Sequence, residues 1–178
     1  MKRVEVALGT RSYAITIAAG LIDQAGEALA PYARSGRIVA VSDENVWAAQ
    51  GVRLSASGLE IVPVLVPAGE GSKSWAQLEA LTERLLELGV ERGDSILALG
   101  GGMVGDLAGF AASILKRGCS YVQVPTSLLA QVDSSVGGKT AINAAAGKNL
   151  IGAFHQPAAV LIDPSTLATL PARELCAG

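Results

Sequence analysis

The segment from Ser95 to Asp106 constrains the fold of this chain more than any other. The apolar run Ser95-Ile-Leu-Ala-Leu99 leads into Gly100-Gly-Gly-Met-Val-Gly105, which fits the spacing G-x-G-x-x-G. A strand, a glycine turn and a helix start in this order are typical of a turn that binds a dinucleotide. Glycines permit positive φ angles, and the free N–H groups at a helix N-terminus attract phosphate. The segment predicts a binding site for the pyrophosphate of a dinucleotide, most simply NAD. A turn that only serves close packing is the alternative.

The rest of the chain alternates between apolar runs and helical patterns. We expect strands at 37–42, 61–66, 95–99, 121–124 and 159–162, helices at 21–32, 46–56, 75–88 and 104–115, and an opening hairpin from 4–8 and 13–18. Ser74 and Gln77 form a capping box at the start of the third helix, and Gly89 ends it. Pro63 places its strand at an edge or a bulge.

This alternation predicts a single α/β domain over residues 1–178, with a mostly parallel sheet and helices on both faces. The glycine turn follows an internal strand, and Pro125 stands where the standard fingerprint has an acid about 20 residues further on. We therefore expect a Rossmann-like sheet of variant topology with an N-terminal hairpin.

Composition and charge exclude several classes of protein. Half of the residues are hydrophobic and 17% are charged, which excludes a disordered chain, and a net charge of −2 without a basic tract gives no footprint for nucleic acid. The stretch from Ser95 to Leu115 is nearly uncharged, but its glycines and Asp106 favour a buried strand and helix over a membrane span. Cys119 and Cys176 are isolated, and the first residues lack an apolar signal core. We expect a cytoplasmic protein with reduced thiols.

Polar residues follow the expected parallel strands, where ligands of such sheets bind. Asp43 and Asn45 could bond a ribose, or Asp43 could simply cap its helix. Glu70 to Lys73 and Thr126 follow two further strands. Asp106 could contact the ligand, or only stabilise the positive end of its helix.

Between Asp133 and Asn149 lies a second polar region. Gly138-Lys139-Thr140 looks like the end of a P-loop, but Asp133 occupies the position where that motif needs glycine, so an ATPase is not expected. Asp133, Lys139, Lys148 and Asn149 could instead face an anionic ligand, or the lysines could be solvated. Arg117 could bind phosphate or lie on the surface.

Metal binding within this chain is not expected. His155 is the only histidine, and the cysteines do not cluster. A single histidine is more often structural than a ligand, so we expect no metal-ligating residues here.

Four segments carry a family resemblance: Pro67-Ala-Gly-Glu70-Gly-Ser-Lys73-Ser74, Ala98-Leu-Gly-Gly-Gly-Met-Val-Gly-Asp106-Leu-Ala-Gly-Phe110, Pro125-Thr-Ser-Leu-Leu-Ala-Gln-Val-Asp133-Ser-Ser-Val-Gly-Gly-Lys-Thr140 and Gly147-Lys-Asn-Leu-Ile-Gly-Ala-Phe154. They resemble the 3-dehydroquinate synthase family over nearly the whole chain, and the third is the most specific. The resemblance implies a carbon–oxygen lyase that uses NAD and a divalent metal, zinc or cobalt. Such an enzyme converts the seven-carbon sugar phosphate DAHP into 3-dehydroquinate and phosphate in the shikimate pathway, toward chorismate and aromatic amino acids.

The resemblance also implies roles for matching residues. The adenosine of the cofactor would lie against Asp43, Glu44 and Asn45, and further contacts along its length would come from Glu70, Gly71, Ser72 and Lys73. The pyrophosphate would lie against Gly101, Gly102, Met103, Val104, Gly105 and Asp106. The nicotinamide side would be formed by Thr126, Ser127, Lys139, Lys148, Thr166, Leu167, Ala168 and Thr169. The catalytic and substrate contacts would be Asp133, Lys139, Asn149 and Arg117. Arg117 would act in a neighbouring subunit, because the family forms homodimers.

Ser127 stands where threonine is common in the family, and length is the larger departure. Family members are about twice as long and have a helical C-terminal domain whose Glu and two His hold the metal. We expect this chain to be the NAD-binding N-terminal domain, to lack that metal-binding domain, and to be inactive alone. The alternatives are another NAD-dependent sugar-phosphate cyclase, such as those that make inosose or valiolone rings, and a stand-alone NAD-binding module.

Overall fold

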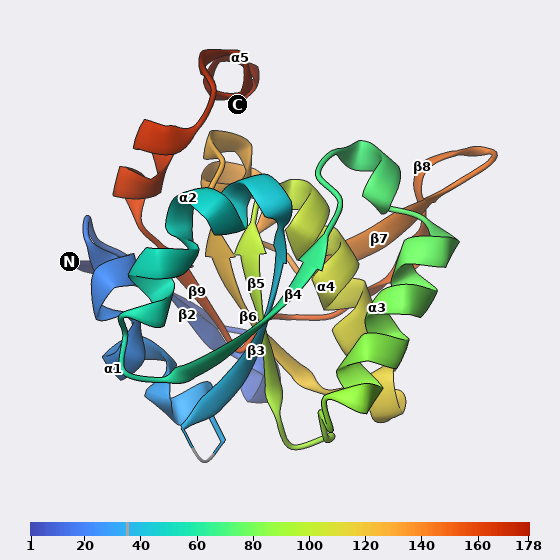
Figure 1. The fold of residues 1–178 in the computed structure, drawn as a ribbon, viewed down its shortest axis with the longest axis horizontal. Helices are drawn as coiled ribbons and strands as arrows, with labels where there is room; N and C mark the ends of the chain where they lie inside the picture. Colours follow the sequence, from blue (N-terminus) through green and yellow to red (C-terminus); the bar gives the residue numbers. More distant parts are fainter. Residues whose placement is uncertain (35) are drawn as a thin grey trace.

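The computed structural model describes residues 1–34 and 36–178. Its centre is a seven-stranded sheet of order β1-β2-β9-β6-β5-β3-β4, and β7 and β8 form a separate two-stranded sheet (Figure 1). The strands are β1 (Lys2–Val6), β2 (Tyr13–Ile17), β3 (Arg37–Asp43), β4 (Glu60–Val66), β5 (Ser95–Gly100), β6 (Ser120–Pro125), β7 (Lys139–Ala144), β8 (Gly147–Phe154) and β9 (Ala159–Ile162).

Five α-helices and several shorter turns connect these strands in the described part of the chain. The α-helices are α1 (Ala25–Leu29), α2 (Glu44–Ser55), α3 (Trp75–Glu87), α4 (Gly102–Ile114) and α5 (Ala172–Ala177). The 3-10 segments are η1 (Gly9–Arg11), η2 (Leu21–Gln24), η3 (Ala30–Tyr32), η4 (Glu70–Ser72), η5 (Leu115–Arg117) and η7 (Pro164–Thr169), and η6 (Ala130–Ser134) is a turn of π-helix.

The pairing of the strands confirms the predicted fold class. β1 and β2 are antiparallel and form the expected hairpin, whereas every other pair in the large sheet is parallel. β4 is an edge strand, one of the two positions that Pro63 predicted, since proline has no N–H to donate to a neighbouring strand. β5 lies between β6 and β3, so the glycine turn indeed follows an internal strand.

Helices cover both faces of the sheet, again as predicted. Ile96 and Ala98 of β5 pack in one core with Leu81 of α3 and Leu107 of α4. The alternate residues Leu97 and Leu99 pack in a second core with Leu29 of α1 and Leu54 of α2. Successive side chains of a strand point to opposite faces, so a doubly covered strand must be apolar throughout, as β5 is.

Half of the predicted capping box of α3 is present, since the Ser74 N–H donates to the carbonyl oxygen of Ser72 at 2.9 Å and not to the Gln77 side chain. The Ser74 hydroxyl accepts a hydrogen bond from the Gln77 N–H at 3.2 Å, and Gly89, just beyond the last turn, has a φ of 73°. Ser95 to Leu115 is divided between β5 and α4. None of the described helices is both long and apolar enough to span a membrane.

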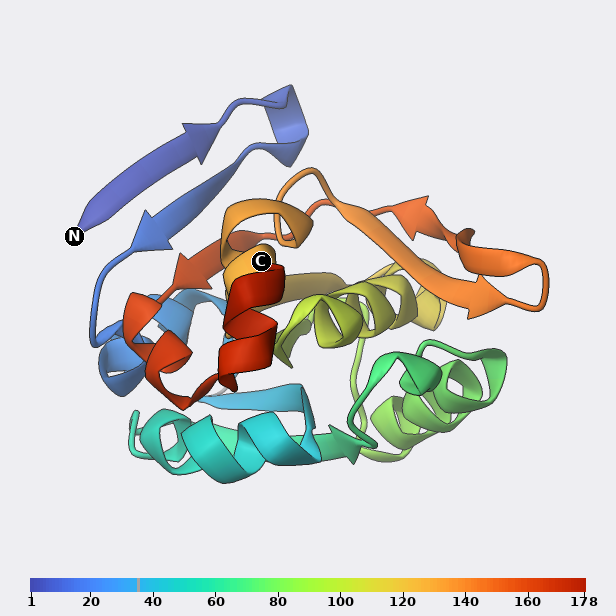
Figure 2. The same ribbon diagram turned by 90° about the horizontal axis from the view of Figure 1, so that it is seen from above.

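Two expectations about elements were wrong. The single helix expected at 21–32 is broken into η2, α1 and η3; Pro31 lies at the start of η3, where its missing N–H interrupts the helical ladder. The region between Thr126 and the last strand, expected to be without strands, contains the β7–β8 hairpin. This hairpin lies alongside α4 and extends away from the sheet (Figure 2). β8 is mostly exposed and only Thr140 and Ile142 of β7 are buried, so the hairpin lacks the long apolar run by which the other strands were recognised.

Candidate functional site

Polar segments meet at one edge of the sheet because the carboxyl ends of parallel strands lie together. Asp43 ends β3, η4 follows β4, the glycine turn follows β5, and Thr126 follows β6 (Figure 1). The N–H of Thr126 donates to the carbonyl oxygen of Gly100 at 2.9 Å, which joins the ends of β5 and β6. The predicted convergence of these segments is therefore present.

The glycine turn is built for close approach rather than for unusual backbone angles. None of Gly100, Gly101, Gly102 and Gly105 has a positive φ, so the expectation that positive φ explains these glycines was wrong. A Cβ at Gly102 would lie 2.9 Å from the Ser134 hydroxyl, and one at Gly105 would lie 2.7 Å from Oε1 of Gln123. The N-terminus of α4 has no side-chain cap among the described residues. Its first N–H groups are therefore open to an anion.

A buried ammonium group stands beside this turn. Lys73, which follows η4, has a side chain only 3% exposed, and its Nζ lies 2.6 Å from Oδ2 of Asp106 on α4. The same Nζ donates to Oδ1 of Asn149 on β8 and lies 3.7 Å from Oε1 of Glu70. Burial raises the pKa of Asp106 above its usual 3.8, although the bond from Lys73 acts against this. The sequence did not reveal this pair, because its partners come from different elements.

Asn143 was also missed by sequence reasoning. Its backbone N–H donates to the carbonyl oxygen of Lys73 at 2.8 Å, and its side chain donates to Oε1 of Glu70 at 2.9 Å. The available signal was its position between two segments of the family resemblance, one that ends at Thr140 and one that begins at Gly147. Because no polar pattern marked it, only the contacts show that it belongs to the site.

A cavity of about 480 Å³ opens next to the Lys73–Asp106 pair. Its lining includes Asp106, Asp133 and Ser134 from the region around the glycine turn, and Lys139 and Asn149 from the hairpin. Three of the four residues predicted to contact substrate therefore share one cavity with Asp106. The apolar rim contains Val136, Leu150 and Phe154, whose exposed fractions are 38%, 61% and 78%.

Two predicted residues lie away from the cavity. Arg117 follows the far end of α4, which with 13 residues is about 20 Å long. Its side chain is exposed and its φ is 66°. Lys148 is exposed near the tip of the β7–β8 hairpin. In a single chain neither residue is brought to Asp133 and Lys139.

Three predicted residues have structural roles at this edge. Oδ1 of Asp43 accepts hydrogen bonds from the N–H groups of Asn45 and Val46, both at 3.0 Å, so the helix-cap alternative is present. Thr126 is buried, and the Ser127 hydroxyl accepts from the N–H of Ala130 at 3.3 Å. Contacts of these side chains with a cofactor stay predictions.

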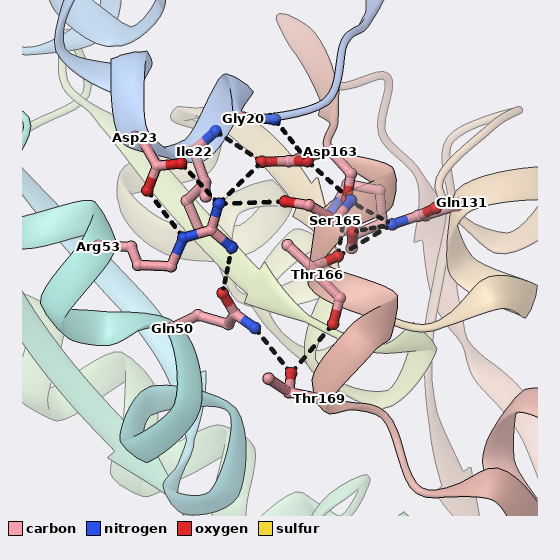
Figure 3. A network of polar contacts seen from close by, with 11 residues as sticks. Gly20, Ile22, Asp23, Gln50, Arg53, Gln131, Asp163, Ser165, Thr166 and Thr169 are labelled. Carbon is pink, nitrogen blue, oxygen red and sulfur yellow. Dashed lines mark hydrogen bonds and ion pairs between the residues drawn. The ribbon is translucent and has the colours of Figure 1, made fainter.

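Thr166 and Thr169, at the two ends of the predicted turn in η7, belong to a polar network that joins several segments (Figure 3). The Thr166 hydroxyl donates to the carbonyl oxygen of Asp163 at 2.8 Å and accepts from the Gln131 side chain at 3.1 Å. The Thr169 hydroxyl accepts from Nε2 of Gln50 at 2.7 Å. The hydroxyls of this turn thus hold η7 against α2 and η6.

Asp163 is the centre of that network (Figure 3). Its buried carboxylate accepts from the N–H groups of Gly20, Ile22 and Ser165 at 2.9–3.0 Å, and Arg53 lies 3.4 Å away. Burial alone acts to raise the pKa of Asp163, but these hydrogen bonds bring it below the usual 3.8. The network fixes the end of β9 to the start of η2.

The residues present fit a bound dinucleotide. Besides the uncapped N-terminus of α4, the Ser134 hydroxyl is buried against Gly102 and has no hydrogen-bond partner among the described residues. A buried hydroxyl without a partner is costly, and a ligand oxygen at the turn would satisfy it. A metal ion does not fit in the same way, because no group of three or more His, Cys, Asp or Glu suited to one occurs in residues 1–34 and 36–178.

Comparisons with known proteins agree with this geometry. The family model described as the 3-dehydroquinate synthase N-terminal matches residues 63–177. The 3-dehydroquinate synthase of Zymomonas mobilis is 58% identical over 98% of this chain and 47% of its own length. The chain spans about half the length of the curated relatives it matches.

Solved structures give the same result for the fold. The 2-epi-5-epi-valiolone synthase ValA from Streptomyces hygroscopicus, with NAD⁺ and Zn²⁺ bound, matches with a TM-score of 0.85 at 33% identity, over 95% of this chain and 48% of that one. A 2-deoxy-scyllo-inosose synthase complexed with carbaglucose-6-phosphate, NAD⁺ and Co²⁺ matches with a TM-score of 0.84 at 28% identity, over 97% of this chain and 48% of that one.

Proposed function

Because the chain belongs to the 3-dehydroquinate synthase family, we propose that it forms the NAD-binding half of an enzyme that converts DAHP into 3-dehydroquinate and phosphate. Such an enzyme is a carbon–oxygen lyase of the shikimate pathway. The observation that carries the proposal is the single cavity shared by Asp106, Asp133, Lys139 and Asn149 beside the uncapped N-terminus of α4.

In this proposal the chain's own residues bind and orient. The N–H groups at the start of α4 hold the pyrophosphate, and Ser134 supplies a further hydrogen bond. NAD, when bound, would reversibly accept a hydride from the carbon that bears a substrate hydroxyl. Lys139 and Asn149 present a cation and an amide to an anionic, hydroxyl-rich substrate, and Asp133 accepts hydrogen bonds from its hydroxyls.

The proposed whole enzyme has a second, helical domain that holds zinc or cobalt. Curated relatives are about twice as long as this chain, and the described residues hold no metal cluster of their own. Leu150 and Phe154 expose large apolar surfaces at the cavity rim, which such a domain would cover. The chain alone would then bind NAD⁺ without turning DAHP over.

The quaternary structure and location are part of the same proposal. We expect a homodimer in which Arg117 binds the substrate phosphate in the neighbouring subunit, because Arg117 does not line the cavity of its own chain. The proposed location is the cytoplasm, which suits the free thiols of Cys119 and Cys176. Sedimentation of the whole enzyme tests the dimer, and a monomer would contradict it.

The first experiment is calorimetric titration of NAD⁺ into this chain. Saturable binding is expected, and Gly102→Ala should weaken it because the added Cβ displaces the Ser134 hydroxyl. Gly93→Ala is the matched control, since a Cβ there meets nothing within 4 Å. Failure of both this chain and the whole enzyme to bind NAD⁺ would refute the proposal.

The second experiment measures phosphate release from DAHP by the whole enzyme with NAD⁺ and Zn²⁺. Asp133→Asn and Lys139→Met should each lower kcat/KM at least a hundredfold, whereas exposed Lys2→Met should not. If Asp133→Asn and Lys139→Met were as active as Lys2→Met, the assignment of the cavity as the substrate site would be contradicted.

A related cyclase remains the second candidate because of the likeness to the inosose and valiolone synthases. Turnover of D-glucose 6-phosphate, with no phosphate release from DAHP, would favour that reading over the first.

A further inference from the structure

The β7–β8 hairpin contains a break in its pairing at the side of the cavity. Ile142 pairs with Ile151, and the next pair is Ala144 with Gly147. The stretch Lys148–Leu150 of β8 therefore lies across from Asn143 alone. Asn149, in the middle of this bulge, has a φ of 57°, in the left-handed region that asparagine tolerates better than most residues.

Asn143 makes three hydrogen bonds that join the bulge to the segment around η4. Its backbone N–H donates to the carbonyl oxygen of Lys73 at 2.8 Å. Its side-chain oxygen accepts from the N–H of Asn149 at 2.9 Å, and its side-chain nitrogen donates to Oε1 of Glu70 at 2.9 Å. One residue thereby links the bulge to η4 and to the residue that follows it.

An amide can make both side-chain contacts at once, because its oxygen accepts and its nitrogen donates. A carboxylate at this position would accept from Asn149 but would face the Glu70 carboxylate with a second negative charge. An apolar side chain would make neither bond. The two residues that Asn143 holds are also those on either side of the Lys73 ammonium, which bonds Asn149 and lies 3.7 Å from Glu70.

We infer that Asn143 is a positioning residue that holds Asn149 and the Glu70–Lys73 turn together, so that the Lys73 ammonium and the Asn149 amide keep their places beside the cavity. The inference deepens the proposed function and rests on it in one respect, namely that the cavity binds NAD⁺ and substrate. The contacts of Asn143 do not depend on that assignment.

The first test is independent of function. In the ligand-free chain, Asn143→Ala should speed hydrogen exchange of the Asn149 N–H at least tenfold, because this N–H loses its acceptor. Amides in the centre of β5, such as Leu97, should be unchanged. Equal protection of the Asn149 N–H in both proteins would overturn the inference, and so would a uniform acceleration that includes Leu97.

The second test uses charge. Asn143→Asp should raise the Kd of this chain for NAD⁺ about tenfold, because the new carboxylate repels Glu70 and displaces the turn. Adding Glu70→Gln restores a donor between the two side chains and should recover most of the affinity, as a double-mutant cycle would show. Gln24→Glu in η2 is the matched control, since it adds the same charge at an exposed residue that does not line the cavity.

The two tests separate the inference from the proposed function. If the wild-type chain and the whole enzyme both fail to bind NAD⁺ while Asn143→Ala exposes the Asn149 N–H, the function fails and the positioning role stands. If NAD⁺ binds but Glu70→Gln gives no rescue, the inference fails and the function stands.

Discussion

The Nζ of Lys73 and Oδ2 of Asp106 lie 2.6 Å apart, with side chains 3% and 18% exposed. The ammonium also bonds Asn149, so a single buried cation connects the loop after β4, the helix after β5 and the hairpin strand β8. A buried charge is tolerated only when it is paired. The pair therefore makes the shape of the cavity wall depend on three distant segments at once.

Lys73→Met should destabilise the chain by about 3 kcal/mol near pH 7, since it leaves the Asp106 carboxylate without its partner. Burial already raises the pKa of Asp106, and loss of Lys73 raises it further. Protonation of Asp106 then removes the unpaired charge, so the loss of stability should become smaller as the pH falls. Urea unfolding at pH 7 and pH 5 measures this. An equal loss at both values, or no recovery in the double variant with Asp106→Asn, would contradict the pairing.

Asp163→Asn should lower the free energy of unfolding by about 2–3 kcal/mol at pH 7, because buried N–H groups lose a charged acceptor. The pKa of Asp163 lies below 3.8 in the folded chain. Its contribution is therefore present above pH 3.8 and is lost as the pH falls through the folded value. The stabilities of wild type and variant should converge as the pH falls further below 3.8, with Glu5→Gln as an exposed control. A constant difference between pH 7 and pH 3 would argue against this linkage.

Gly109→Ala should destabilise the chain by about 1–3 kcal/mol, although alanine favours helices over glycine by about 1 kcal/mol. An added Cβ would lie 2.5 Å from Cγ2 of Thr140, so α4 and β7 would have to separate. Gly93→Ala is the matched control, because nothing lies within 4 Å of its Cβ. Thermal unfolding of both variants measures the difference. A more stable Gly109→Ala variant would show that the hairpin does not pack on α4.

The two cysteines should differ sharply in reactivity. Cys119 is buried, and burial raises the pKa of its thiol to about 11, whereas Cys176 is exposed. At pH 8 an aromatic disulfide reagent should therefore modify one thiol per native chain rapidly and both in denaturant. Rapid modification of both thiols in the native chain would be incompatible with the burial of Cys119.

Local patterns were sufficient for much of the fold. The alternation of apolar runs and helical periods predicted the parallel sheet, Pro63 predicted an edge or a bulge, of which the edge is present, and Ser74 predicted the start of α3. The topology of a parallel sheet then predicted that residues after β3, β4, β5 and β6 would meet. These predictions succeeded because each depends on residues that are close in sequence or on a general rule of topology.

The site was less predictable because its contacts join distant segments. The β7–β8 hairpin was missed, and with it the bulge that places Asn143 and Asn149. The glycines were attributed to positive φ, but they are required where Ser134 and Gln123 approach α4. No local pattern shows which side chain will face a glycine from another element.

The sequence by itself determined the fold class, the position of the glycine turn after β5 and the membership of a family, since each depends on continuous runs of residues. Only the tertiary structure decided that Lys73 pairs with Asp106, that Asn143 connects Glu70 to Asn149, and that Arg117 does not line the cavity. The physical reason is that a buried charge or amide must find its partner wherever packing brings one, and packing is a property of the whole chain.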